Sequence, residues 1–345
     1  MNIAVPMFDY VDVIAQITDG STVQKLTITK TQYGAAPLFA NHVVNTTNTS
    51  TAANWEVESS YIEDSDHNKT SYAYAGLVGD IAANCKVSLK FTNNATDDEG
   101  NVNVSGSTNV GLFCGELGAN SVLTANFDST SSNKSYSITT TSGAAGGIVG
   151  KMTSGSKLIL TGSGFGSVTQ SINGATYAGG IVGEAHDAYI GTDTANEPTA
   201  DMSITSGFKA SGTTLNGGTA SGYLFGYYEN TASDTASGNV VTPAKKFTID
   251  SSFRNVPLTF ASNNAGGYFG VLENNTSSAG TIVFDGGISD VTANLNSSTD
   301  TLLNINFGSG KSNQGGVIYK YKTNSLMNIL NVKNTFVYNH TSNVN

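Results

Sequence analysis

Short runs of apolar residues recur along this chain at nearly regular intervals. The clearest run is a heptapeptide that occurs at Ala144–Gly150 and, almost unchanged, at Tyr177–Gly183. Looser copies end at residues 79, 115, 226, 270 and 319, so the spacing between successive copies lies between 33 and 49 residues. Repeats of this length are typical of solenoids, propellers and helical arrays. The Gly, Ser, Thr and Val content of the repeat disfavours helices and suits strands and turns.

Each repeat contains three short apolar segments, which predicts one turn of a parallel β-helix with three strands and three corners. The heptapeptide is the first segment, and an alternating run such as Val87, Leu89 and Phe91 is the second. Alternation of this kind predicts a strand with one buried face. We predict that this run stacks in successive turns on Leu123 and Phe127, Leu158 and Leu160, Met202 and Ile204, Phe247 and Ile249, and Ile282 and Phe284. The third segment is predicted at residues 102–104, 136–138, 256–260 and 291–295. Matched positions of the heptapeptide form an apolar ladder: Val78, Cys114, Val149, Val182, Phe225, Phe269 and Ile318. Because a propeller blade needs four antiparallel strands, we predict instead a right-handed single-stranded parallel β-helix of about seven turns.

The glycines of the heptapeptide are predicted to be structural. Every residue that aligns with Gly146 is Gly or Ala, which indicates a corner where a larger side chain would collide with a stacked turn. The position of Gly147 also admits Leu112 and Tyr223, so this position is predicted to face outward. The predicted repeat glycines are Gly79, Gly115, Gly146, Gly150, Gly179, Gly183, Gly222, Gly226, Gly266 and Gly270.

The two ends of the chain follow the pattern less closely. Residues 1–70 are predicted to form a degenerate turn or cap, and residues 71–345 the repeats, because terminal repeats are commonly atypical. Ala36–Ala40 lies about one period before Gly79, and Phe8–Ile14 fits either a strand or a helix. The longer repeats after Gly183, Gly226 and Gly270 contain polar insertions, predicted as loops, such as residues 191–200 and 229–238.

The Gly-Gly-Ile-Val-Gly element at residues 146–150 and 179–183, followed by a polar gap and an alternating strand, resembles the GLUG motif. Fair matches occur at residues 75–79, 111–115 and 266–270, and loose ones at 222–226 and 315–319. The resemblance covers residues 71–330. It implies a β-solenoid of a secreted or cell-surface protein, chiefly bacterial and adhesin-like, and it implies no catalytic residues.

Charge and composition exclude several functions. The net charge is −10 and Arg254 is the single arginine, whereas nucleic-acid binding requires clustered cations. Apolar runs are too short to span a membrane as a helix. Residues 1–6 lack the basic and apolar regions of a signal peptide, so we expect either a removed signal or a segment of a longer chain. Two cysteines, Cys85 and Cys114, make no disulfide framework and are predicted to be buried and unpaired.

Metal and cofactor sites are not predicted. The histidines His42, His67, His186 and His340 show no ligand spacing and are predicted to be exposed in loops. The acidic clusters at residues 63–67 and 97–101 leave calcium as an alternative, because oxygen-rich loops bind this ion. Neither cluster repeats in the next turn, as a calcium-binding solenoid would require.

Catalysis is also not predicted. Asp80, Glu116 and Glu184 are the carboxylates that would line one face of the helix, but Lys151 interrupts their row. Glycosidases need two carboxylates that face each other across the sugar. The row is therefore interpreted as a surface ladder of alternating charge.

Two aromatic residues are candidates for ligand contact. Tyr223 and Tyr227 replace a glycine and a charged residue of the other repeats, so both are predicted to be exposed. Exposed aromatic rings can stack on sugars or dock a protein partner.

The sequence thus predicts an extracellular structural or adhesive solenoid that acts as a stalk or presents binding loops. Its expected partners are a surface protein or glycan of a host or neighbouring cell, or copies of itself. The alternatives are a carbohydrate-binding or carbohydrate-cleaving β-helix and a subunit of an extracellular filament.

Overall fold

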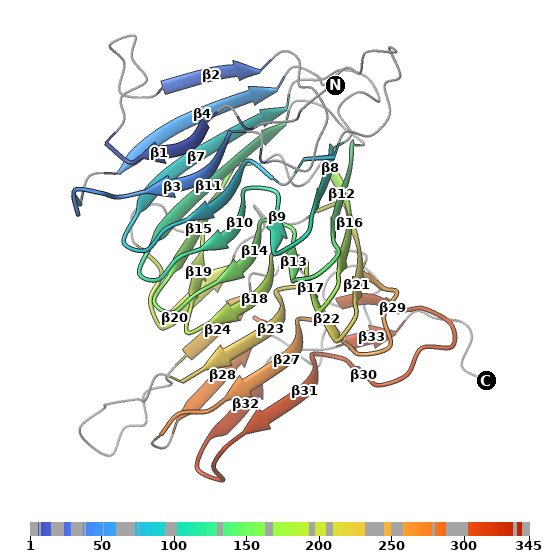
Figure 1. Ribbon diagram of the computed structural model, residues 1–345. Coiled ribbons are helices and arrows are strands. Elements are labelled where there is room, and N and C mark those ends of the chain that lie inside the picture. Colours follow the sequence, from blue (N-terminus) through green and yellow to red (C-terminus); the bar gives the residue numbers. More distant parts are fainter. Residues whose placement is uncertain are drawn as a thin grey trace.

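A computed structural model shows a solenoid in which every regular element among the described residues is a β-strand (Figure 1). The described residues are 6, 8–14, 24–28, 37, 39–50, 52–59, 73–74, 76–93, 102–129, 134–162, 168–192, 197–204, 210–231, 245–249, 258–277, 280–287, 303–333 and 337–339.

The strands form five sheets, named A to E here. Sheet A contains β1 (Phe8–Asp12), β3 (Ala40–Val44), β6 (Val78–Ile81), β10 (Cys114–Leu117), β14 (Val149–Met152), β18 (Val182–His186), β23 (Phe225–Asn230), β27 (Phe269–Asn274) and β31 (Ile318–Thr323). Sheet B contains β2 (Gln24–Ile28), β4 (Ala53–Ser59), β7 (Lys86–Asn93), β11 (Val122–Ser129), β15 (Lys157–Thr161) and β19 (Tyr189–Gly191). Sheet E contains β20 (Asp201–Ile204), β24 (Lys245–Ile249), β28 (Thr281–Asp285) and β32 (Ile329–Lys333).

The other two sheets complete each turn. Sheet C contains β5 (Ala73–Tyr74), β8 (Val102–Gly106), β12 (Lys134–Thr140), β16 (Val168–Gly174), β21 (Gly212–Gly217), β25 (Leu258–Phe260), β29 (Leu303–Phe307) and β33 (Val337–Asn339). Sheet D contains β9 (Val110–Gly111), β13 (Ala145–Gly146), β17 (Tyr177–Gly179), β22 (Ala220–Gly222), β26 (Ala265–Gly266) and β30 (Gln314–Gly315). Paired strands come from successive turns and run parallel, as in β10 with β14 and β12 with β16. The predicted parallel β-solenoid is confirmed.

The heptapeptide is divided between two sheets. In the copy at residues 144–150, β13 ends at Gly146, the chain turns a corner, and β14 begins at Val149. A Cβ atom on Gly146 would lie 1.9 Å from the carbonyl oxygen of Val149. The predicted steric limit at this corner is therefore confirmed. Six turns, with the strands β9 to β30 of sheet D, have a short fourth strand in addition to the three predicted.

The prediction that the Gly147 position faces outward is wrong. A Cβ atom on Gly147 would lie 2.0 Å from the carbonyl oxygen of Gly180. Leu112 and Tyr223, which occupy this position in other turns, are 0% and 1% exposed. A Cβ atom on Gly180 would lie 2.4 Å from the ring of Tyr223. Large residues are tolerated here because a glycine in the neighbouring turn leaves room for the ring.

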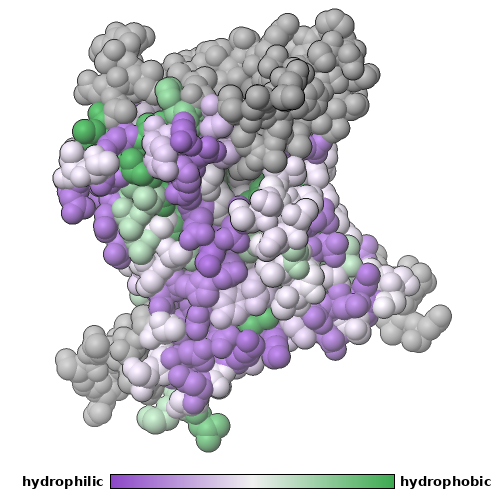
Figure 2. All heavy atoms as spheres, viewed as in Figure 1, coloured by the Kyte–Doolittle hydropathy of each residue, from purple (hydrophilic) through white to green (hydrophobic). Residues whose placement is uncertain are grey.

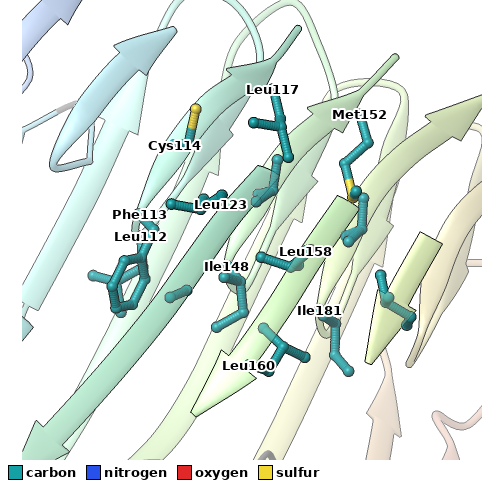
Figure 3. Close-up of a cluster of buried hydrophobic side chains, with 14 of the residues drawn as sticks. Leu112, Phe113, Cys114, Leu117, Leu123, Ile148, Met152, Leu158, Leu160 and Ile181 are labelled. Atoms are coloured by element: carbon teal, nitrogen blue, oxygen red, sulfur yellow. The ribbon is translucent and has the colours of Figure 1, made fainter. Parts of the chain in front are cut away.

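The core is a stack of apolar ladders enclosed by the sheets (Figure 3). The ladder that includes Val78, Cys114 and Val149 pairs as predicted. So does the ladder of Val87 with Leu123 and Leu158 in sheet B. Rings that lie at equal registers stack, as in Phe91 with Phe127 at 5.7 Å between ring centroids. Repetition of similar side chains on adjacent turns thus fills the interior continuously.

The predicted register fails at the insertion at residues 191–200 and again between β24 and β28, whereas the predicted pairs Met202–Phe247 and Ile204–Ile249 are confirmed. Leu158 pairs with Ile190 rather than with the predicted Met202, because β19 closes sheet B before the insertion and β20 opens sheet E after it. Phe247 pairs with Phe284, and Lys245 takes the place opposite Ile282. The predicted pairing of Phe247 with Ile282 is therefore wrong by two residues.

The first 70 residues contain strands of the same sheets. Residues 8–12 form strand β1, which decides between the two predicted alternatives. Ala40 pairs with Val78, so Asn41 lies opposite Gly79, one residue from the predicted alignment. The predicted strand at residues 291–295 lies outside the described residues.

Candidate functional site on the outer face of sheet A

Sheet A turns one row of side chains toward solvent, because alternate residues of a strand point to opposite faces. The register places these residues side by side in the row Tyr10, His42, Asp80, Glu116, Lys151, Glu184, Tyr227, Val271 and Lys320. The predicted ladder of Asp80, Glu116, Lys151 and Glu184 is thus confirmed. In Figure 2 a hydrophilic band runs along the front of the molecule over these strands.

A polar pocket of about 470 Å³ lies at the N-terminal part of this row. His42, Asp80 and Glu116 line one side, and the chain between β8 and β9, including Asn109, lines the other. His42 Nδ1 lies 2.5 Å from Asp80 Oδ1. Asn109 donates a hydrogen bond to Glu116 at 3.3 Å. The pocket therefore offers an imidazole, two carboxylates and an amide on adjacent turns.

A second polar cluster is centred on His186, farther along sheet A. Its ring nitrogens lie 2.7 Å from Glu184 and 2.7 Å from Glu229, so the imidazole bridges two carboxylates on neighbouring strands. The hydrogen bond to Glu184 raises the pKa of His186, and the same bond lowers the pKa of Glu184. The Glu184 carboxylate also lies 3.6 Å from the Lys151 amine. The imidazole, the two carboxylates and the amine are thus paired with one another, and about a third of the His186 side chain stays exposed.

Aromatic side chains pack together beside this cluster on the outer face of sheet A. Tyr177 stacks on Tyr227 with 5.0 Å between ring centroids and 28° between ring planes. Tyr227, Ala220 and Val271 form a small apolar cluster outside the main core, with Tyr177 and Tyr319 packed against it. Tyr227 donates a hydrogen bond to Glu273 at 3.1 Å. Burial raises the pKa of Tyr177, as expected for a phenol with part of its ring covered.

The predicted exposure of the two candidate tyrosines is wrong. Tyr223 is 1% exposed and points into the core, for the reason given above for the Gly147 position. Tyr227 lies on the outer face of sheet A but is only 9% exposed, because Tyr177 covers it. Tyr177 and Tyr319, which pack against Tyr227, are partly exposed and were not predicted as candidates.

Two of the histidines also lie elsewhere than predicted. His42 and His186 belong to strands β3 and β18 and contact carboxylates, whereas the prediction placed them in exposed loops. His42 was missed because its position opposite Asp80 becomes visible only when the first repeat is aligned in the correct register with the second. His67 and His340 lie outside the described residues.

The cysteines are buried and unpaired, as predicted. Burial raises the pKa of Cys85 to about 11 and also raises the pKa of Cys114, so neither thiol is activated. The acidic clusters at residues 63–67 and 97–101 lie outside the described residues. The described residues contain no group of three or more acidic, His or Cys side chains arranged to hold a metal ion.

The insertion after Gly183 is only partly described. Glu197 accepts hydrogen bonds at 2.8 Å from Lys86 and from Lys157, which lie two turns apart in sheet B. This part of the predicted loop is therefore fixed to the wall of the solenoid. Residues 193–196 and most of the predicted loop 229–238 lie outside the described residues.

Comparison with known proteins adds no relative. No family model, no curated protein and no solved structure matches this chain. Among the described residues there is no helix long and apolar enough to cross a membrane.

Proposed function

We propose that this chain is an adhesive β-solenoid segment of a secreted or cell-surface protein, and that the outer face of sheet A binds its ligand. The observation that supports this proposal most directly is the pocket lined by His42, Asp80, Glu116 and Asn109, in register with the tyrosine cluster. The resemblance to the GLUG motif and the polar, weakly charged composition agree with an extracellular setting.

The ligand class that fits this face best is a linear glycan. Aromatic rings such as Tyr177 stack on the apolar face of a sugar, and carboxylates, amides and imidazoles bond its hydroxyl groups. Asp80 and Tyr227 are four turns apart in the row, or roughly 19 Å at about 4.8 Å per strand. An extended polymer that lies along the row can therefore contact both the pocket and the tyrosines.

We propose binding without cleavage. Asp80 and Glu116 are adjacent in one ladder and project from the same face, whereas a glycosidase places its two carboxylates on either side of the scissile bond. Each carboxylate also has a partner of its own, His42 for Asp80 and Asn109 for Glu116. In this proposal the row of Asp80, Glu116, Lys151 and Glu184 keeps the non-catalytic role predicted from the sequence.

A glycan array tests the proposal directly. The unmodified chain is expected to bind one class of linear glycan, and both Tyr177→Ala and Glu116→Gln to weaken that binding at least tenfold. Lys246→Ala is the matched control, because this lysine lies on sheet E and pairs with Asp201 at 3.2 Å. Absence of binding to every glycan would refute a glycan ligand, and shortened products after incubation would refute binding without cleavage.

A further inference from the structure

Among the described residues, large exposed apolar side chains occur at the two ends of the solenoid and not in its middle. These side chains are Tyr10, Ile14, Leu326, Met327, Ile329 and Val332. Tyr10 and Ile14 belong to the first turn, and the other four belong to the last. Leu326 and Met327 lie in the turn between β31 and β32, and Figure 1 shows this turn at the bottom of the solenoid. Apolar surface that gathers in this way marks an interaction site.

The outermost strands of sheet A lie at the same ends. Strand β1 is the first and β31 the last of the nine strands in sheet A, so each pairs with a neighbour on one side only among the described residues. An open edge presents unpaired N–H and C=O groups to any strand that fits them. Because all pairs in sheet A are parallel, a strand added to either edge in the same sense would continue the sheet.

The two edge strands of sheet A differ in charge: β1 is acidic and β31 is basic. After Asp300 the sequence contains no acidic residue but four lysines, at Lys311, Lys320, Lys322 and Lys333. At the other end, β1 contains Asp9 and Asp12 and no basic residue. Opposite charges on two surfaces steer those surfaces together and disfavour contact between like ends.

The register of sheet A aligns these features. Extending the ladder by one step from β31 to β1 of a second copy places Ile318 beside Phe8 and Tyr321 beside Val11. The same step places Lys320 beside Tyr10, a cation over an exposed ring. It also places Lys322 beside Asp12, an ion pair between adjacent strands. Apolar, cation–aromatic and charge-paired positions all match.

We propose that the C-terminal end of one copy docks on the N-terminal end of a second copy, so that β31 of the first extends sheet A through β1 of the second. This contact joins two different surfaces, and each added copy offers a new free end. Such a heterologous contact that does not close on itself builds a filament. The proposal concerns the ends of the rod and is independent of ligand binding on its outer face.

Sedimentation velocity of the unmodified chain over a range of concentrations provides the first test. Average mass is expected to rise with concentration in steps of one chain, and electron microscopy to show rods that lengthen at constant width. Because ion pairs contribute, raising the salt from about 0.02 M to about 0.5 M is expected to shift the series toward monomer. A chain that stays monomeric at every concentration in low salt overturns the proposal, whatever the variants do.

Two variants then test the direction of the contact. Tyr10→Lys places a cation opposite Lys320 and blocks the N-terminal end, and Lys320→Glu places an acid near Asp9 and Asp12 and blocks the C-terminal end. Each is expected to need at least tenfold higher concentration to assemble, while Lys246→Glu, the same charge reversal in the middle of the rod, assembles normally. Thermal melts check that all three fold.

Mixing the two blocked variants distinguishes a head-to-tail contact from a symmetric one. The unmodified C-terminal end of Tyr10→Lys fits the unmodified N-terminal end of Lys320→Glu, and the two substituted ends carry opposite charges at facing positions. The mixture is therefore expected to assemble at a lower concentration than either variant alone. If Tyr10→Lys alone forms dimers as readily as the unmodified chain, the contact joins like ends and the proposal is wrong. A mixture that stays monomeric contradicts it equally.

Discussion

Single residues determine how closely successive turns approach each other, and Gly146 is the clearest case. A Cβ atom at this position would lie 1.9 Å from the carbonyl oxygen of Val149 and 2.7 Å from the amide nitrogen of Gly183. Both contacts are with backbone, which cannot rotate away as a side chain would. The preference for glycine at this position in the repeats therefore has a steric origin.

We expect Gly146→Ala to destabilise the protein by about 3 kcal/mol or more, since overpacking against backbone forces the chain to move. Gly308→Ala is the control, because the nearest atom to its added Cβ, the carbonyl oxygen of Phe260, is 3.3 Å away. We expect that change to cost less than about 1 kcal/mol. Urea denaturation followed by circular dichroism measures both, and equal small effects would show that the corner is not sterically limited.

Lys245 is a residue whose chemistry conflicts with its position. Its side chain is 0% exposed, and it lies opposite Ile282 in a ladder that is otherwise apolar. The amine lies 3.4 Å from the centre of the Tyr189 ring and has no hydrogen-bond partner among the described residues. Burial lowers the pKa of Lys245 to about 8. The cation–aromatic contact offsets only part of the desolvation of this charge.

We expect Lys245→Met to stabilise the protein at pH 7 by roughly 1–3 kcal/mol, because it removes a buried charge while keeping the apolar stem. In the pH range between about 8 and the unfolded value near 10.4, the unfolded state binds more protons, so unmodified stability rises with pH. The advantage of the variant should therefore shrink between pH 7 and pH 10. Denaturation at both pH values measures this change, and a destabilised variant at pH 7 would contradict it.

At the scale of strands, register explains what the sequence predicted and what it did not. Wherever repeats are uninterrupted, as from β6 through β18, matched apolar positions predicted the pairs in sheet A correctly. The prediction failed at the insertion between Gly191 and Asp201. The strand before the insertion pairs in sheet B and the strand after it pairs in sheet E, whereas the sequence was interpreted as one strand preceded by a longer loop. A one-dimensional pattern does not reveal which of two apolar segments pairs with the previous turn.

The candidate site was harder to predict for the same reason. Its components come from different turns, and contacts between them depend on register to within one residue. Asp80, Glu116 and Glu184 were recognised as one row because their repeats align well. His42 was not, since its repeat is the faintest, and Tyr223 was misplaced because a glycine in the next turn accommodates it.

His186 connects β18 to β23, so its protonation couples two neighbouring strands. The pKa of His186 is raised by its hydrogen bond with Glu184, and the stability this contributes is complete below the unfolded pKa near 6.5. It is lost as the pH rises through the raised folded value. Glu184, whose pKa is lowered, acts oppositely: its contribution is lost as the pH falls below about 4.5.

We therefore expect the contribution of His186 to stability to be about 1 kcal/mol larger near pH 6 than near pH 8.5, a value kept low because the network is partly exposed. His186→Gln should remove most of that difference, since glutamine keeps a hydrogen bond but takes up no proton. Thermal melts at the two pH values make the comparison. If His186→Gln keeps the full pH dependence of stability, other titratable groups cause that dependence.

At the scale of the whole molecule, contacts run almost entirely between adjacent turns. Stability in such an array is approximately a sum of terms for each turn and each interface between neighbours. Strands β10 to β23 of sheet A have partners on both sides, whereas β1 and β31 have one among the described residues. Amide protection should thus be greatest in the central turns and fall toward both ends when the chain is studied at concentrations where it is monomeric.

A substitution in one central turn tests how far cooperativity extends. The ring of Phe225 contacts Phe269 at 5.8 Å, Phe247 at 5.8 Å and Tyr228 at 4.8 Å between centroids, so Phe225→Ala leaves a cavity shared by adjacent turns. We expect a loss of about 3–5 kcal/mol. Hydrogen exchange should show reduced protection first in β18, β23 and β27, with β6 and β7 retaining theirs, because each turn is stabilised mainly by its neighbours. Equal loss in every strand would instead show that the nine strands of sheet A unfold as one unit, and that distant turns depend on each other more strongly than their contacts indicate.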